Sequence, residues 1–175
     1  MNNFYLRYIF IFIAIVIAQA VIFNHLVLFN VAVPLIFVSL IVILPVTTGT
    51  GLSTMLGFLT GFVIDIFSDT PGVNALSCTV LAFMRKPVFH LYVSLDDDLA
   101  GRSPSGRSMG SPAFMKYLLT MVLIYCVLVF SIEAFQFFNL RLLILRILAS
   151  TVYTFLLIYA FDSLTIRRRE KKLQS

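Results

Sequence analysis

The sequence predicts an all-α protein that crosses a membrane several times as a helix bundle, and two observations lead to this prediction. Of its 175 residues, 60% are hydrophobic and 12% are charged, whereas typical soluble domains have about 45–50% and about 25%. Apolar runs close to the roughly 20 residues that span a hydrocarbon core recur along the chain. A chain of this size cannot bury so much apolar surface in a water-soluble core. We therefore expect one integral-membrane domain over residues 1–175.

Six apolar runs are candidates for membrane helices. The second opens at Pro34, and proline is well tolerated in the first turn of a helix. The fourth reaches membrane length only if its helix continues past Arg85 and Lys86, whose charges would snorkel to the interface, with Pro87 bending or ending the helix. Five spans, with the fourth lying partly at the interface, are the alternative. The predicted spans are residues 5–29, 33–46, 52–67, 72–93, 114–132 and 140–166.

The positive charges favour an orientation with both chain ends in the cytoplasm. Eleven of the 13 Lys and Arg residues fall in the segments that six spans place inside, and the predicted outer loops hold none. Such a bias marks the cytoplasmic side of membrane proteins, and it explains the net charge of +5 without nucleic-acid binding. One inner segment, 94–113, is predicted to be a flexible loop from its Gly, Ser and Pro content. The basic tail 167–175 is predicted to attract anionic lipids, with a contact to a cytoplasmic protein as the alternative.

The N-terminus has a competing interpretation. Arg7, the apolar stretch after it and Ala18-Gln19-Ala20 are typical of a cleavable signal peptide. The apolar run continues through Val21-Ile22-Phe23, where a mature domain should turn polar. We therefore expect an uncleaved first span.

The third predicted span carries a stripe of small and polar residues that leads into a turn. Four members recur every fourth residue, which places them on one face of a helix, and two of these are glycines in a GxxxG pattern that lets helix backbones approach closely. A carboxylate ends the stripe, and a turn-forming sequence follows it. The pattern predicts either a close helix contact within the chain or a surface that docks a partner or a small ligand. The candidate residues are Ser53, Gly57, Gly61, Asp65, Gly72 and Asn74.

A second set of polar residues joins the predicted fifth and sixth spans. Glu133 ends the fifth, and Arg141 and Arg146 lie in the sixth. An ionisable group inside a span costs on the order of 2.5–3.5 kcal/mol on insertion scales, so each needs a partner. We expect an intramembrane ion pair between Glu133 and the arginines, and a site for an anion or a partner's carboxylate is the alternative. Arg146 shares its helix face with Ser150 and Thr154, so this face should contact protein rather than lipid.

The residues predict neither catalytic nor metal chemistry. Asp65 and Asp162, the only candidate acidic pair for intramembrane proteolysis, fall near opposite faces of the membrane, whereas a proton-sharing pair needs a separation of a few ångströms. The two histidines also fall on opposite sides. Cys78 and Cys126 suggest neither a disulfide framework nor a metal motif. We therefore expect no cofactor and no enzymatic activity.

Residues 57–68, followed by Gly72-Val73-Asn74-Ala75, resemble the signature of the bacterial rod shape-determining MreD family. Members of that family carry a Gly-rich third span that ends in an aspartate, then a short turn with a glycine opening the next helix. The region near Asn24, the prolines at Pro34 and Leu44-Pro45 and the basic C-terminal end are also similar. The resemblance implies a non-enzymatic, multi-pass subunit of the cell-elongation machinery in the bacterial inner membrane.

The resemblance also implies partners. Proteins of this family associate with MreC, a single-span protein with a large external domain. Through it they connect to the MreB filament and to RodA with its penicillin-binding transpeptidase, which build peptidoglycan. The stripe that includes Gly57 and Gly61 would then dock the MreC helix.

A different class of function is the alternative to this scaffold. Six short spans with charged stripes also suit the substrate-binding subunit of a vitamin transporter, in which Asp65, Arg141 and Arg146 line an outward-facing pocket. Such a pocket needs polar and aromatic lids. The predicted outer loops are short and uncharged apart from Asp69 and Glu133, which favours the scaffold.

Overall fold

The computed structural model describes residues 2–21, 32–93, 103–106, 108–134 and 140–173. These residues form helices and no strand. Three helical segments are long and apolar enough to cross a membrane by length and composition: Thr50–Ser68, Ser111–Glu133 and Leu140–Ser163. The all-α class and the membrane-type composition of these three helices are therefore confirmed. The elements are α1 (Asn2–Val21), α2 (Val38–Val42), α3 (Thr50–Ser68), α4 (Val73–His90), α5 (Ser111–Glu133) and α6 (Leu140–Leu173).

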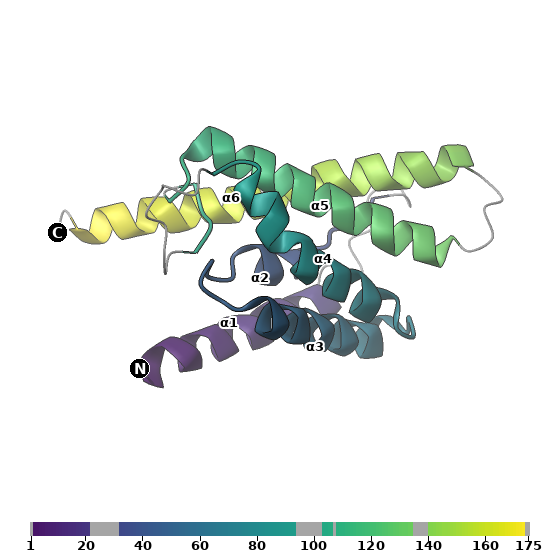
Figure 1. Cartoon of the computed structure of the whole chain (residues 1–175), viewed down its shortest axis with the longest axis horizontal. Coiled ribbons are helices and arrows are strands. Elements are labelled where there is room, and N and C mark those ends of the chain that lie inside the picture. Colours follow the sequence, from purple (N-terminus) through teal and green to yellow (C-terminus); the bar gives the residue numbers. More distant parts are fainter. Residues whose placement is uncertain (1, 22–31, 94–102, 107, 135–139, 174–175) are drawn as a thin grey trace.

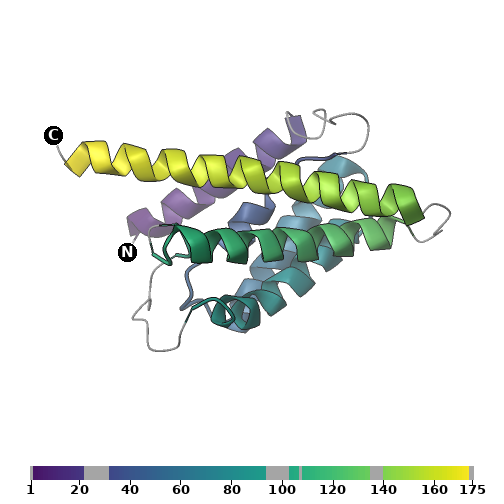
Figure 2. The same cartoon turned by 90° about the horizontal axis from the view of Figure 1, so that it is seen from above.

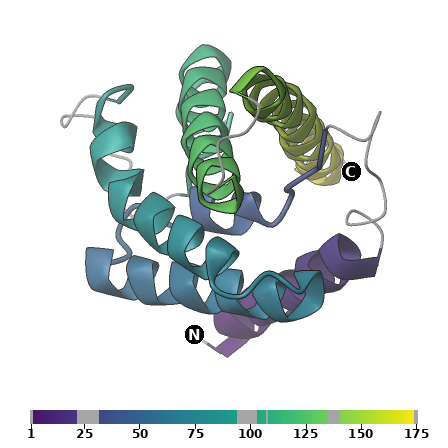
Figure 3. The same cartoon turned by 90° about the vertical axis from the view of Figure 1, so that its right-hand side faces the viewer.

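Four of the helices, α3 to α6, are arranged as two hairpins, and the short helix α2 lies between them (Figure 1). α3 packs against α4 in one hairpin and α5 against α6 in the other, and α4 also contacts α5. α1 lies beside α3, and α2 sits between the two halves, in contact with α3, α4 and α5 (Figure 3). The start of α1 and the end of α6 lie toward the same end of the long axis (Figures 1 and 2).

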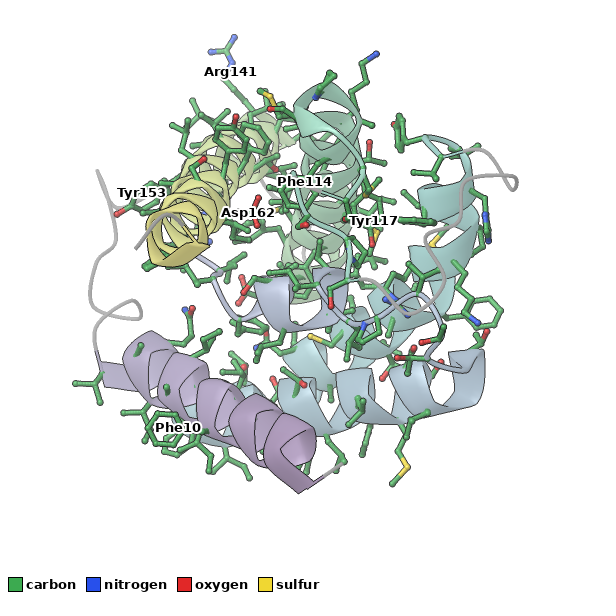
Figure 4. All side chains as sticks on the ribbon, turned by 90° about the vertical axis from the view of Figure 1, so that its left-hand side faces the viewer. Phe10, Phe114, Tyr117, Arg141, Tyr153 and Asp162 are labelled. Atoms are coloured by element: carbon green, nitrogen blue, oxygen red, sulfur yellow. The ribbon has the colours of Figure 1, made fainter. Side chains whose placement is uncertain are left out.

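The core lies where α2, α4 and α5 meet. The ring of Phe37, just before α2, meets Tyr125 of α5 edge to face at 5.6 Å between centroids. Phe114 and Tyr117 of α5 are fully buried and point into the interior (Figure 4). The outer faces of α3 and α6, by contrast, expose many Leu, Ile, Phe and Met side chains. An apolar outer surface of this extent suits lipid rather than water.

The predicted second span, 33–46, does not form one helix, so this expectation is wrong. α2 covers only five residues, about 7 Å of helix, and the residues on either side of it are non-helical. Pro34 lacks a backbone donor, and Pro45 disfavours helical geometry at Leu44. The apolar run is therefore helical only between its two prolines.

α4 continues past Arg85 and through Pro87 to His90, which confirms the predicted continuation. The expectation that Arg85 snorkels is wrong, because its side chain is only 2% exposed. Its Nη1 donates a hydrogen bond to the carbonyl of Leu44 and its Nη2 donates to that of Pro45 at 3.1 Å. Arg85 is thus directed into the protein, toward the chain that follows α2.

Several predicted boundaries differ from those of the helices. α5 begins at Ser111, three residues before the predicted span and inside the predicted loop 94–113. Residues 167–173 of the predicted tail continue α6. Of the predicted first span, 22–29 lie outside the described residues, as do 94–102 and 107 of the loop.

Candidate functional site

The predicted stripe of the third span faces α4 along its whole length. At one end, Ser53 Oγ accepts a hydrogen bond from Arg85 Nη2 at 3.3 Å. At the other end, Asp65 binds the first turn of α4. All four members of the stripe are buried. The structure therefore places the stripe in a contact within the chain, and a partner helix cannot use this face while α4 occupies it.

The two glycines of the stripe allow the α3 and α4 backbones to approach closely. A Cβ atom on Gly61 would lie 2.3 Å from the carbonyl oxygen of Asn74, and one on Gly57 would lie 2.7 Å from that of Cys78. These are backbone atoms, so they cannot move aside without separating the helices. Gly51, in the same helix, has nothing within 4 Å of the corresponding position. The GxxxG pattern thus serves a close helix contact.

Asp65 caps the N-terminus of α4 from the neighbouring helix. Its Oδ1 accepts a hydrogen bond from the backbone N–H of Asn74 at 2.9 Å, and its Oδ2 accepts one from Ala75 at 2.8 Å. The first N–H groups of a helix have no partner within the helix, and Gly72, the residue before α4, has no side chain to supply one. The negative charge also interacts favourably with the helix dipole at this end.

The turn between α3 and α4 contains two residues with left-handed backbone conformation. Asp69 ends α3 with φ 54°, and Gly72 precedes α4 with φ 81°. Glycine adopts this conformation readily, and aspartate is among the few other residues that tolerate it. Between them, Thr70 donates a hydrogen bond from its Oγ1 to Asp65 Oδ1 at 2.9 Å. The turn residues therefore hold the carboxylate over the start of α4.

Asn74 links this hairpin to α5. Its Nδ2 donates hydrogen bonds to Asp65 Oδ1 and Thr70 Oγ1, both at 3.0 Å, and its Oδ1 accepts one from the hydroxyl of Tyr125 at 2.5 Å. We call Asp65, Thr70, Asn74 and Tyr125 the Asp65 cluster. Asp65 and Asn74 were predicted as candidates, whereas Tyr125 was not. A tyrosine in an apolar run gives no sign of a partner 51 residues away.

The predicted ion pair is not formed in the described part of the chain. Glu133, Arg141 and Arg146 are all exposed, and no nitrogen–oxygen contact within 4.0 Å joins Glu133 to either arginine. Arg141 projects away from the body of the molecule (Figure 4). Neither arginine is brought to Asp65, whose oxygens are occupied by the α4 turn.

The non-helical segment before α2 donates hydrogen bonds to side chains of α6. Ser150 Oγ accepts one from the backbone N–H of Val33 at 3.1 Å, and Thr154 Oγ1 accepts one from Leu35 at 3.0 Å. Both hydroxyl side chains are fully buried. The expectation that this face of the sixth helix contacts protein holds for these two residues, while Arg146 on the same face is exposed.

α1 binds the same segment, and α5 binds the end of α2. Gln19 donates from Nε2 to the carbonyl of Pro34 at 2.8 Å and accepts at Oε1 from the N–H of Ile36 at 3.0 Å. Further along, the hydroxyl of Tyr117 donates to the carbonyl of Val42 at 3.3 Å. Non-helical backbone is tolerated at membrane depth only where protein satisfies its polar groups. The staple residues that do so are Gln19, Arg85, Ser150 and Thr154, and Tyr117 satisfies the last carbonyl of α2.

The two carboxylates considered for proteolysis lie apart. Asp162 points from α6 toward the interior (Figure 4) and accepts a hydrogen bond from the N–H of Gly106, shortly before α5 begins. Asp65, near the end of α3, lies beside the first turn of α4. Cys78 and Cys126 are buried as separate thiols. Within the described residues, no group of three or more His, Cys, Asp or Glu could hold a metal ion.

Comparison with known proteins gives no match to this chain, whether with family models, curated proteins or solved structures. The fold and the site define a class: an all-helical protein with helices suited to a membrane, built on a close-packed hairpin and a stapled non-helical segment.

Proposed function

We propose that this chain is a multi-pass scaffold subunit of the bacterial cell-elongation machinery, of the kind that the MreD family provides. The observation that carries the proposal is the segment 57–75. Its resemblance to the family's signature coincides with the α3–α4 hairpin, where the two backbones approach closely and the Asp65 cluster forms. The residues that carry the resemblance thus have structural roles in this chain, in the close helix contact and in the hydrogen bonds of the Asp65 cluster.

In this proposal the chain crosses the inner membrane six times with both ends in the cytoplasm. The second crossing runs through residues 32–49 and is only partly helical. The order of its contacts supports this path: Ser150 and Thr154 of α6 bind its first part, and Arg85 of α4 binds its last part. The common position of the start of α1 and the end of α6 (Figure 2) also supports an even number of crossings.

The chain acts by holding partners together and not by catalysis. Its direct partner is an MreC-like single-span protein, through which it connects to MreB, RodA and the penicillin-binding transpeptidase. The partner helix contacts a face other than the stripe of Gly57 and Gly61, because α4 covers that face.

Depletion of the protein in a rod-shaped bacterium that carries its gene tests this function. We expect the cells to become round, and we expect rod shape to be restored by the wild-type chain and by Gly51→Ala, but not by Gly61→Leu. Depleted cells that stay rod-shaped, or that lose uptake of a vitamin while keeping their shape, would contradict the proposal.

A further inference from the structure

α6 is the least buried of the three candidate membrane helices. Of its most apolar stretch, 22% is buried inside the chain, against 33% for that of α3 and 50% for that of α5. It packs mainly against α5 and lies at the edge of the bundle (Figure 3). Exposed and half-buried residues recur every three or four positions along it, which places them on one side of the helix. We call them the outer face of α6: Leu142, Leu145, Arg146, Ala149, Val152, Tyr153 and Leu156.

Arg146 places a positive charge on this face, inside the candidate span. It lies six residues, about 9 Å, from the start of α6. Its side chain is exposed, and beside it Leu142 and Leu145 are 51% and 50% exposed. No carboxylate among the described residues forms an ion pair with it. Charged groups within a span usually pair with other protein groups, so Arg146 is left to pair with a group from outside the chain.

Tyr153 adds a second polar group to the same face, two turns further along. It points from α6 to the side away from α5 (Figure 4), and its hydroxyl has no hydrogen bond among the described residues. It lies about 20 Å from the start of α6, near the middle of the 24-residue span. A long cationic side chain at the depth of Arg146 reaches lipid head groups, but the head groups do not come near Tyr153. The hydroxyl therefore favours protein over lipid as the cover of this face.

The arrangement of the face suits a helix. Ala149 lies one turn from both Arg146 and Tyr153, and a small side chain at this position lets another helix approach closely. A helix packed over Ala149 would contact both polar groups.

We infer that the outer face of α6 binds one membrane helix whose carboxylate pairs with Arg146. The positive charge defines the partner's chemistry, a Glu or Asp inside its own span at the depth of Arg146. The inference rests on the proposed function for the existence of a single-span partner. It adds the face and the chemistry by which that partner is held.

Binding of two synthetic membrane helices to the full chain in mild detergent tests this inference. Both are leucine–alanine helices of about 20 residues that carry a quencher. One has a glutamate about six residues from one end, to match the depth of Arg146, and the other has a glutamine there. A fluorophore on Val152→Cys reports contact with the outer face of α6, and one on Phe62→Cys, on the outside of α3, is the control. These two side chains are 55% and 49% exposed, whereas the native cysteines are buried.

We expect the glutamate helix to bind about tenfold more tightly than the glutamine helix, since it adds one charge-assisted hydrogen bond. It should quench the label on Val152→Cys and not the label on Phe62→Cys. Arg146→Gln should remove the tenfold preference. Arg141→Gln should keep it, because Arg141 projects away from the body of the molecule (Figure 4). Arg146→Glu should prefer a lysine helix of the same design, a reversal that misfolding would not produce.

Equal binding of the two helices by the wild type, equal quenching of the two labels, or a preference that survives in Arg146→Gln would overturn the inference. Binding of phosphatidylglycerol that depends on Arg146, with no preference between the helices, would overturn it in favour of a lipid. The synthetic helices make this test separate from the cell-shape test. If depleted cells stay rod-shaped while the glutamate helix still binds through Arg146, the scaffold function fails and the docking face stands.

Discussion

Asp65 stabilises two helices with one carboxylate. It belongs to the last turns of α3, yet its oxygens satisfy the first N–H groups of α4 and the hydroxyl of Thr70. An aspartate at the end of an apolar span is unfavourable unless it is paired. Here it is paired with N–H donors that would otherwise lack partners. The carboxylate thus gains donors, and the start of α4 gains acceptors.

Asp65→Asn should destabilise the protein by about 1–3 kcal/mol, because one carboxylate oxygen is replaced by an NH₂ group that faces a backbone donor. Asp69→Asn is the matched control: Asp69 is exposed in the same turn, and asparagine tolerates its left-handed conformation. Thermal unfolding in detergent measures both. Equal unfolding temperatures for the two variants would show that the Asp65 cluster contributes nothing.

Gly61→Ala should destabilise by about 1–3 kcal/mol, because the added methyl meets the backbone of α4 and forces the helices apart. Gly51→Ala is the control in the same helix. It meets nothing and should lie within about 1 kcal/mol of the wild type, on the more stable side. The same unfolding measurement applies, and a Gly61→Ala protein as stable as Gly51→Ala would contradict the close packing.

The sequence predicted some of these residues because their spacing encodes a helix face. Ser53, Gly57, Gly61 and Asp65 repeat every fourth residue, and they share one contact surface. Tyr125 and Arg85 were missed for the opposite reason. Their partners lie about 40 to 50 residues away in sequence, and only the packing of α4 against α2 and α5 brings them together.

The structure of the segment around α2 differs from the membrane helix that its apolar sequence predicts. Its composition is that of a membrane helix, but only five residues between Pro34 and Pro45 are helical. The lost backbone hydrogen bonds are replaced by side chains from α1, α4, α5 and α6. Composition alone could not predict this, because the replacement donors and acceptors come from separate helices.

Thr154→Val should destabilise by about 1–3 kcal/mol, since it keeps the shape of the side chain but leaves the N–H of Leu35 without an acceptor. Thr154→Ser keeps the hydroxyl and loses only a methyl group, so it should retain most of the stability. Thermal unfolding of the two variants is the comparison. If Thr154→Ser is the less stable, packing and not the hydrogen bond determines the role of this residue.

The architecture of the whole chain and its orientation in the membrane rest on different kinds of support. Its helical class and the membrane-type composition of three helices are confirmed. The orientation remains a prediction from the distribution of positive charge, because the helices by themselves do not indicate which side of the membrane they face.

Reporter fusions at the two termini test the orientation. We expect reporters that work in the cytoplasm to be active at both ends, and reporters that work outside the membrane to be inactive at both. Opposite activities at the two ends would indicate an odd number of crossings. Such a result would mean that residues 32–49 enter and leave the membrane on one side.

Affinity purification of the tagged chain in mild detergent tests the scaffold function most directly. We expect one single-span membrane protein with a large external domain to co-purify in near-equal amount with the wild type and with Gly51→Ala. We also expect Gly61→Leu, which disrupts the α3–α4 hairpin, to lose this partner. Co-purification of transporter subunits in its place, or of no single-span protein, would contradict the account.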